Sequence, residues 1–323
     1  MVNKSKKFSL RLNRSELSVP GSRPEFFEKA AASDSDIIFF DLEDSVAIEK
    51  KIQARKNVIQ AIQDIDWGKK SLSVRVNSIN SGYFESDLKS LMETNISRLD
   101  LLMLPKVESE KDVLKLEKIV KSYEKKYKRS NKIGFELIIE TARGLINVNK
   151  IAKASEKIES LHFGAADFAA SIGAKTLNIG GVNEFFGTLS SRKNKKRAFF
   201  LNDIWQVALF NIKLAASANN LRAIDCPYGD FNDYEGFESI SRSSYTLGFD
   251  GKMVIHPNQI KLANKIFSPT KKEYLQAKEM LKVIEESSSK GKGAVAFKGK
   301  LLDNVTIKQA NNIVHLYQQI IKK

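Results

Sequence analysis

Short apolar runs rich in β-branched residues recur along the chain, and longer amphipathic stretches separate them. Continuous apolar runs of this length are typical of strands that are buried on both faces, as in a parallel sheet. Eight such runs can be counted: SELSVP (15–20), DIIFFDLE (36–43), SLSVRVN (71–77), LDLLMLPKV (99–107), GFELIIE (134–140), SLHFGAAD (160–167), LRAIDCP (221–227) and KMVIHP (252–257).

Helical patterns occupy the intervals between these runs: 24–33, 51–65, 86–94, 110–127, 145–157, 203–220 and 236–248. No break in composition and no linker rich in Pro, Gly or Ser divides the alternation. Eight successive β and α segments of this kind predict an α/β fold, a single (β/α)8 TIM barrel, rather than two domains. We expect residues 1–270 to form this catalytic barrel.

Two segments exceed what a barrel needs. The stretch from about 168 to 200 is too long for an ordinary loop, and loops of that size are usually functional or disordered. After the eighth strand a helical pattern at 271–290 leads through the glycine- and lysine-rich link KGKGAVAFKGK to a last helix at 301–323. We expect residues 271–323 to form a C-terminal helical extension that packs on its own barrel or reaches a neighbouring subunit.

Composition narrows the class of protein. The formal net charge is +15, but the lysines are spread over many helical and loop segments, which favours a solvated basic surface or a phosphate-bearing ligand over nucleic acid. The single cysteine, Cys226, excludes an internal disulfide and a cysteine-cluster metal site. Neither a membrane span nor a signal peptide is evident, so the expectation is a cytoplasmic protein.

Acidic residues gather where the predicted strands end, which is where a (β/α)8 barrel builds its active site. They are Asp41, Glu43, Asp44, Glu140, Asp167 and Asp225, joined by Arg75, Asn77, Lys106 and His256. So many converging carboxylates would repel one another unless a cation lay among them. Oxygen ligands without cysteine indicate Mg²⁺ or Mn²⁺, with Glu140 and Asp167 as ligands. The alternative for each is a helix cap or an ion pair with lysine.

Arg75 alternates with apolar neighbours in VRVN, so we expect it to point into the barrel mouth with Asn77 on the same side. There it would offer a rigid fork to a carboxylate or a developing oxyanion; the alternative is a structural ion pair. His256 is a candidate ligand-binding residue or, alternatively, a core histidine bonded to backbone. Asp41 and Glu43 are expected to hydrogen-bond a water on the ion and orient Arg75, while Asp44 pairs with a basic neighbour or caps a turn.

Several motifs in order resemble the malyl-CoA lyase and citrate lyase β-subunit-like family, especially its L-malyl-CoA/β-methylmalyl-CoA lyases. They run from about residue 12 to the C-terminal helix: RSELSVPGSRPEFFEKAAASDSDIIFFDLEDSVAIEKKIQAR, LSVRVNS, LPKVES, ELIIETARG, LHFGAADFAASIGA, AIDCPYGDFNDYEGF and GFDGKMVIHPNQI. The resemblance implies a Mg²⁺-dependent carbon–carbon lyase that reversibly splits a β-hydroxyacyl-CoA into a shorter acyl-CoA and glyoxylate.

The resemblance also implies residue roles. Glu140 and Asp167 would hold the metal, and Arg75 would contact the glyoxylate or enolate oxygen. Positions matching CoA or substrate contacts are Ser18, Val19, Arg23, Lys29, Ala166, Asp167, Ile255 and His256. The segment GKLLDNVTIKQA matches a mobile lid whose aspartate, Asp303, would enter a neighbouring subunit's site in a trimer or hexamer.

Removing the α-proton of acetyl-CoA or propionyl-CoA needs a strong base, and a carboxylate desolvated by a closing lid gains basicity. Asp303 is the candidate, with a helix N-cap as the alternative role. Three other functions stay open. They are a malyl-CoA thioesterase that uses the same metal, a citramalyl-CoA lyase, whose substrate differs by one methyl group, and a basic nucleic-acid-binding protein.

Overall fold

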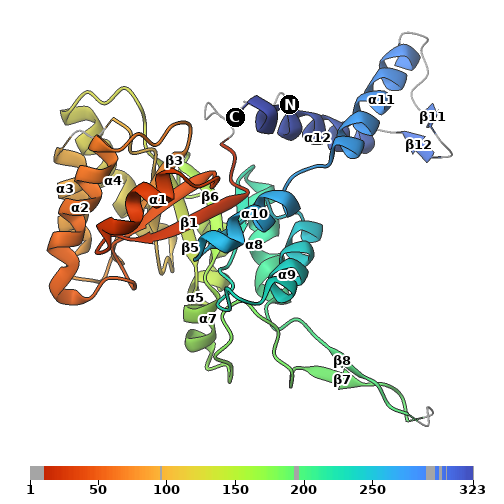
Figure 1. The fold of residues 1–323 in the computed structure, drawn as a ribbon, viewed down its shortest axis with the longest axis horizontal. Helices are drawn as coiled ribbons and strands as arrows, with labels where there is room; N and C mark the ends of the chain where they lie inside the picture. The colour runs from red at the N-terminus through yellow and green to blue at the C-terminus, as the bar shows by residue number, and fades with distance from the viewer. Residues whose placement is uncertain are drawn as a thin grey trace. The chain divides into compact units, whose positions relative to one another are not determined.

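The computed structural model describes residues 11–94, 97–192, 196–288, 295–297, 300–302 and 304–322. Eight parallel strands close into a barrel in the order β1-β10-β9-β6-β5-β4-β3-β2, which confirms the predicted TIM barrel (Figure 1). These strands are β1 Ser15–Pro20, β2 Ile37–Asp41, β3 Ser71–Arg75, β4 Leu101–Leu104, β5 Gly134–Ile139, β6 Ile158–Phe163, β9 Arg222–Asp225 and β10 Gly251–Val254.

Each strand is buried on both faces, which explains the unbroken apolar runs. On β2, Phe40 points outward, where its ring makes edge-to-face contacts with Phe27 and Trp67 at centroid distances of 5.2 and 5.3 Å. Its neighbour Phe39 points inward and joins a buried apolar cluster with residues from four other strands, Met103, Ile138, Ile224 and Met253. Alternation therefore builds two cores, one inside the barrel and one beneath the helices.

The helices of the barrel unit follow the strands in sequence. They are α1 Phe27–Ala31, α2 Lys51–Asp64, α3 Phe84–Glu93, α4 Glu110–Lys126, α5 Ala142–Ile146, α6 Val148–Ile151, α7 Ala165–Ile172, α8 Gln206–Ala218, α9 Tyr234–Leu247 and α10 Pro257–Ile266, with 3₁₀ turns η1 Pro24–Phe26 and η2 Ile48–Lys50. The helix predicted at 145–157 is instead two short pieces, α5 and α6. The backbone N–H of Asn147, between them, donates to the carbonyl of Arg143.

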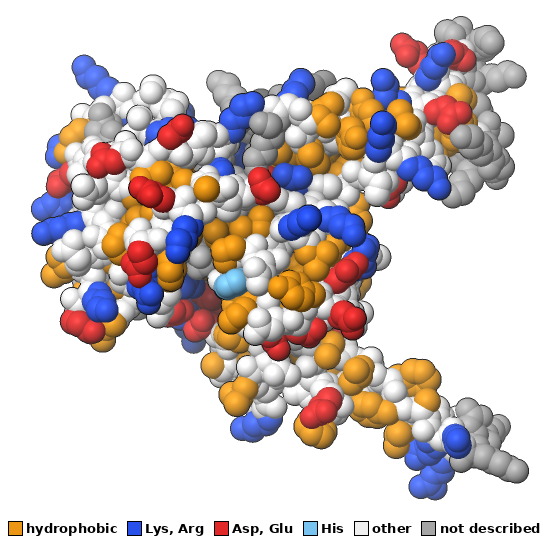
Figure 2. Space-filling view, in the orientation of Figure 1, with side chains coloured by type: hydrophobic (Ala, Val, Ile, Leu, Met, Phe, Trp, Pro, Cys, Tyr) orange, Lys and Arg blue, Asp and Glu red, His pale blue; other side chains and the backbone are white. Residues whose placement is uncertain are grey.

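The long segment after α7 is neither an open loop nor a further barrel element. It contains an antiparallel hairpin, β7 Gly187–Leu189 paired with β8 Phe199–Leu201. Both strands are exposed and carry large apolar side chains, which form an orange band along the hairpin in Figure 2. Of the basic stretch 191–197, residues 193–195 lie outside the described part of the chain.

The chain divides into two compact units. The barrel unit spans Asn13–Asn264, and the second unit comprises the residues from Lys265 to the C-terminus with the N-terminal residues up to Leu12. The sequence-based boundary at 270/271 falls six residues later. No helix among the described residues is both long and apolar enough to cross a membrane.

The second unit contains α11 Lys271–Ser288, β11 Val295–Phe297, β12 Lys300–Leu302 and α12 Asn304–Lys322. The rings of Tyr274 and Tyr317 stack at 4.3 Å and join α11 to α12. The two helices match the predicted ones, whereas the link between them was not predicted to contain strands. Asp303, between β12 and α12, lies outside the described residues, so the structure gives no account of its side chain.

Candidate active site

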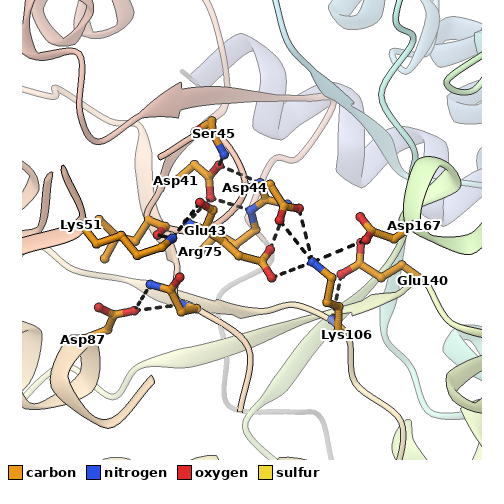
Figure 3. Close-up of polar contacts among 12 residues, drawn as sticks. Asp41, Glu43, Asp44, Ser45, Lys51, Arg75, Asp87, Lys106, Glu140 and Asp167 are labelled. Atoms are coloured by element: carbon orange, nitrogen blue, oxygen red, sulfur yellow. Dashed lines mark hydrogen bonds and ion pairs between the residues drawn. The ribbon is translucent and has the colours of Figure 1, made fainter. Parts of the chain in front are cut away.

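Asp41 and Arg75 end neighbouring strands and face each other in register, β2 against β3. Arg75 Nε donates to Asp41 Oδ1 and Arg75 Nη2 to Asp41 Oδ2, both at 2.7 Å (Figure 3). A bidentate pair of this kind fixes the guanidinium plane as well as its position. The structure therefore holds Arg75 in one orientation at the end of the barrel.

Both carboxylate oxygens of Asp41 are fully used in hydrogen bonds. Its side chain also accepts hydrogen bonds from the backbone N–H groups of Glu43 and Ser45, each at 2.9 Å. Burial raises the pKa of Asp41, but the charge and hydrogen bonds of Arg75 outweigh burial and lower that pKa to about 2. With both oxygens engaged and the residue fully buried, Asp41 has no lone pair for a water on the ion, so that part of the expectation is wrong.

Glu43 is positioned differently from Asp41. Its Oε1 accepts from Lys106 Nζ at 2.8 Å, and its Oε2 lies 3.5 Å from Arg75 Nη1 but has no hydrogen-bond partner among the described residues. Burial raises the pKa of Glu43 to about 7, although Arg75 acts in the opposite direction. Lys51 Nζ donates to the carbonyls of Leu42 and Glu43 and so fixes the turn. At the mouth, Oε2 of Glu43 is therefore buried beside Arg75 without accepting a hydrogen bond from any described residue.

Lys106 occupies the centre of the acidic cluster, a role that the sequence did not reveal. Its Nζ lies 2.8 Å from Glu43, 3.3 Å from Asp44 and 3.5 Å from Asp167, so Asp44 pairs with a basic neighbour as expected. Its backbone has φ 52°, in the left-handed region, which costs a lysine roughly 1–2 kcal/mol. In that conformation its backbone N–H donates to Glu140 Oε1 at 2.7 Å. In the sequence, the only indication of this role was that Lys106 lies at the end of a predicted strand.

Glu140 follows β5 and is 2% exposed. Burial, with a further contribution from the charges of Asp167 and Glu43, raises the pKa of Glu140 to about 8 despite the opposing charge of Arg75. Glycine at position 164 permits the close approach of this carboxylate, because a Cβ there would lie 2.3 Å from Glu140 Oε2. A buried carboxylate with a raised pKa is one that a cation would stabilise.

Asp167 does not end a strand, contrary to expectation. β6 stops at Phe163, and Asp167 lies in the first turn of α7, where its carboxylate approaches Lys106 beside Glu140 (Figure 3). Its side chain is 37% exposed, so it faces the open end of the barrel. Glu140, Asp167 and Oε2 of Glu43, which is ion-paired with Arg75 but accepts no hydrogen bond from the described part of the chain, supply only oxygen atoms, which fits a hard divalent cation such as Mg²⁺.

Asn77 does not share the mouth with Arg75. Its backbone N–H and its side-chain amide both donate to Asp87 Oδ2 of α3, at 2.9 and 2.6 Å. Asp87 in turn accepts from Arg55 Nε of α2 at 2.9 Å. The alternation of side-chain direction that predicted Asn77 at the mouth ends with β3 at Arg75. Asn77 lies beyond the strand and connects its end to α3.

Four further positions lie in β1 or in the segment that follows it. Ser18 is partly exposed, whereas the Val19 side chain is 2% exposed, so Val19 can offer a ligand only its backbone. Arg23 is exposed beyond the strand, pairs with Glu25 and lies with its guanidinium carbon 4.8 Å from the centroid of Phe26. Lys29 is exposed on α1. These two cations are accessible to an anionic ligand.

The other positions that the sequence singled out follow β6 and β10. Ala166 is exposed in α7, and Ile255 is 39% exposed directly after β10. His256 is not a core histidine: its ring stacks on Phe231 at 4.6 Å, and its Nδ1 accepts from the backbone N–H of Asn258 at 3.2 Å. The stacked pair is a partly exposed aromatic surface on loops that follow two adjacent strands.

Comparisons with known proteins agree with this geometry. The family model "HpcH/HpaI aldolase/citrate lyase" matches residues 14–257. An L-malyl-CoA/beta-methylmalyl-CoA lyase of Cereibacter sphaeroides is 43% identical over 96% of each chain, and a malyl-CoA/beta-methylmalyl-CoA/citramalyl-CoA lyase of Chloroflexus aurantiacus is 33% identical over 90% of this chain and 83% of that one.

Among solved structures, the CitE protein of Mycobacterium tuberculosis in complex with magnesium, acetoacetate and coenzyme A superposes with a TM-score of 0.69. That protein is 28% identical to this chain, and the match covers 94% of this chain and 97% of that one.

Proposed function

The chain belongs to the HpcH/HpaI aldolase/citrate lyase family and is a carbon–carbon lyase of the malyl-CoA lyase type, and from this premise we propose its substrates. The proposed reaction is the reversible, Mg²⁺-dependent cleavage of (S)-malyl-CoA to acetyl-CoA and glyoxylate, of β-methylmalyl-CoA to propionyl-CoA and glyoxylate, or of both. The observation that carries the proposal is Glu140 and Asp167 beside a rigidly held Arg75, in a chain 43% identical to lyases of that name.

The residues at the mouth suit the bond that must break. Glu140 and Asp167 would hold Mg²⁺, and the buried Oε2 of Glu43, which accepts no hydrogen bond from the residues that the structure describes, lies in the same cluster 3.5 Å from Arg75 Nη1. When bound, Mg²⁺ would act as a Lewis acid on the substrate's hydroxyl and carboxylate oxygens and lower the pKa of the hydroxyl group. As the hydroxyl proton passes to water, its oxygen forms the carbonyl of glyoxylate and the electrons of the carbon–carbon bond move onto the thioester as an enolate. The enolate then takes a proton at its α-carbon and leaves as acetyl-CoA or propionyl-CoA.

Arg75 and Lys106 would meet the negative charge that develops on oxygen. Arg75 is fixed in advance by Asp41, so little reorganisation is needed when charge appears. Burial lowers the pKa of Lys106, but its hydrogen bond to Glu43 and the nearby carboxylates raise that pKa above the ordinary value, so the side chain stays cationic at neutral pH. Both cations therefore remain charged throughout the proposed reaction.

Proton transfer at the α-carbon is assigned to Asp303 of the C-terminal lid. In the condensation direction this carboxylate would remove the α-proton of acetyl-CoA or propionyl-CoA after the lid has excluded water. We propose that the lid comes from a neighbouring subunit of a trimer or hexamer. Asp303 follows β12 directly in the chain, and the residues on either side of it belong to the second compact unit.

The coenzyme A moiety would bind along the rim after β1 and β10. Arg23 and Lys29 are exposed cations suited to phosphate groups, and Ser18 and Val19 near the end of β1 would contact the same ligand. Ala166, Ile255 and His256 would line the acyl portion. The cytoplasm is the proposed location, in keeping with a single, unpaired and buried cysteine.

One incubation tests the reaction. The chain is mixed with Mg²⁺, glyoxylate and either acetyl-CoA or propionyl-CoA, and free thiol and product mass are followed together. A condensed thioester without thiol release is the expected result. The variant Glu140→Gln/Asp167→Asn is the matched control and should form no product.

Other outcomes identify other functions. Thiol release from malyl-CoA without glyoxylate would indicate a thioesterase, and condensation with pyruvate in preference to glyoxylate would indicate a citramalyl-CoA lyase. The second outcome has a specific basis in the similarity to the Chloroflexus aurantiacus enzyme. A methyl group changes binding by only about 1–3 kcal/mol, so both 2-oxo acids need to be measured in parallel. Binding of DNA or RNA at moderate salt without turnover would overturn the proposal. We do not expect this result, because the lysine and arginine side chains on the face shown in Figure 2 are interspersed with acidic ones.

A further inference from the structure

A second polar layer lies inside the barrel, on the far side of the apolar cluster from the mouth. On β5, Glu136, Ile138 and Glu140 alternate along one face, and Ile138 belongs to the buried apolar cluster. All eight strands are parallel and run toward the mouth, so Glu16 and Glu136 lie near the beginnings of β1 and β5, whereas His162 lies further along β6, in register with Ile138. This layer is therefore separate from the active site.

Three potential metal ligands meet in this layer. They are Glu16 of β1, Glu136 of β5 and His162 of β6, and each is 0% exposed. One ligand atom from each lies within 4.8 Å of the others. The imidazole contacts both carboxylates, with Nδ1 3.8 Å from Glu16 Oε2 and Nε2 3.7 Å from Glu136 Oε1.

Part of this cluster is supported by hydrogen bonds. Ser73 Oγ donates to Glu136 Oε2 at 2.6 Å, and Ser160 Oγ lies 2.9 Å from His162 Nε2. Such partners fix the orientation of a ligating carboxylate and imidazole in metal sites. Two of the three side chains are thus held in place before any ion binds.

The other polar atoms of the cluster make longer contacts but, among the described residues, no hydrogen bond of normal geometry. Within the part of the chain that the structure describes, neither oxygen of Glu16 nor Nδ1 of His162 has a hydrogen-bond partner. Burying a polar group without a hydrogen-bond partner destabilises the folded chain, and burying a charged group does so more strongly. Burial and the neighbouring Glu136 carboxylate raise the pKa of Glu16 well above its ordinary value, although Arg222 and Asn13 act in the opposite direction. Arg222 Nη2 itself donates to Glu159 at 2.8 Å. The unpartnered atoms of Glu16 and His162 face each other, as ligands of one ion would.

We propose that Glu16, Glu136 and His162 bind a divalent transition-metal ion, Mn²⁺ or Zn²⁺, inside the barrel. Two carboxylates balance the charge of a divalent ion, and an imidazole ligand favours these metals over Mg²⁺ or Ca²⁺. β1 and β5 lie opposite each other in the eight-stranded ring. The ion would therefore tie the two sides of the barrel together and contribute stability rather than chemistry at the mouth.

The test measures metal in the full-length chain after expression with Mn²⁺ and Zn²⁺ and exhaustive dialysis against EDTA and Mg²⁺. We expect about one transition-metal ion per chain in the wild type and in Glu140→Gln/Asp167→Asn, and far less in Glu16→Gln and His162→Gln. The mouth variant is the matched control, since it removes two carboxylates from the same barrel. Metal that remains bound in the mouth variant would belong to the site inside the barrel and not to the proposed catalytic site.

A second measurement follows melting temperature after refolding with and without Mn²⁺, because a buried site loads slowly in the folded chain. Mn²⁺ should raise the melting temperature of the wild type and the mouth variant, but not of Glu16→Gln or His162→Gln. A folded wild type that holds no ion and shows no shift would overturn the proposal, and so would stoichiometric metal in Glu16→Gln. The wild-type result stands even if one of the variants fails to fold.

Discussion

Arg75 is contacted by three acidic side chains at the end of β2 and in the turn that follows it: Asp41, Glu43 and Asp44. Only Asp41 binds it bidentately, and Asp41 is buried, so solvent cannot replace it. Glu43 and Asp44 divide their contacts between Arg75 and Lys106. One short acidic segment thus orients both cations of the mouth.

Replacing Arg75 by lysine should separate orientation from charge. Arg75→Lys keeps a positive charge but loses the fork that matches a carboxylate, so we expect turnover to fall about 100-fold or more. The KM for acetyl-CoA should change little, because the coenzyme A moiety binds elsewhere, along the rim. Steady-state kinetics of condensation measures both, with Arg98→Lys, an exposed arginine outside the mouth, as the control. Equal losses in the two variants would contradict the role of Arg75.

Glu140 should make Mg²⁺ binding depend on pH. Burial raises the pKa of Glu140 to about 8 in the metal-free chain, and a metal ligand must be deprotonated. The proton therefore competes with Mg²⁺ below that pH, and the dissociation constant should rise about tenfold for each pH unit below the pKa. Calorimetric titration with Mg²⁺ across this range measures the effect. The variant Glu140→Gln should abolish this pH dependence. The control variant Glu49→Gln, which removes an exposed carboxylate, should preserve it. A Mg²⁺ affinity that does not change with pH in the wild type would refute the assignment of Glu140.

At the scale of elements, the junction between β6 and α7 determines how closely the two proposed metal ligands approach. Asp167 comes from the first turn of α7, and Gly164 lies between the strand and the helix. The absence of a side chain at Gly164 lets Glu140 of the neighbouring strand pack against the junction. The geometry of the proposed metal site therefore depends on a residue that has no functional group.

Gly164→Ala tests this dependence. Its Cβ would lie 2.3 Å from Glu140 Oε2 and 3.0 Å from Ile138 Cγ2, so the Glu140 carboxylate must move. We expect Mg²⁺ affinity to fall at least about tenfold, the loss seen when the support of a metal ligand is disturbed, while circular dichroism still reports a folded barrel. Gly82→Ala is the matched control, because a Cβ there meets nothing within 4 Å. Unchanged Mg²⁺ affinity in Gly164→Ala would show that Glu140 does not bind the ion.

At the scale of the whole molecule, the barrel unit holds the proposed metal ligands and Arg75, while the proposed base Asp303 follows β12 of the second unit. A complete site would then need both units, whether from one chain or from two. The family resemblance implies that the second unit comes from a neighbouring subunit.

Mixing two inactive variants distinguishes these arrangements. Asp303→Asn should lower condensation turnover about 100-fold or more while leaving Mg²⁺ affinity unchanged, since general-base catalysis typically contributes 10²–10⁴-fold. Arg75→Lys should lower turnover for a different reason, because it removes the guanidinium group from the barrel. If the lid enters a neighbour's barrel, hybrid oligomers contain sites with both residues intact, and activity should partly return on mixing. Full turnover by Asp303→Asn would remove the base assignment, and no recovery in hybrids would place the lid over its own barrel.

The sequence by itself determined the eight strands, most of the helices and the acidic strand ends, because burial on both faces and helical periodicity are written into contiguous residues. It located Arg75, Asp41 and Glu140 correctly at strand ends, because strand direction in a barrel fixes which end forms the mouth. It missed the left-handed backbone of Lys106, the turn of Asn77 toward α3, the position of Asp167 in a helix and the cluster of Glu16 with His162. Only the tertiary structure decided these contacts, since they join residues that are far apart in the chain and meet through strand register, barrel closure and the exact path of the connecting loops.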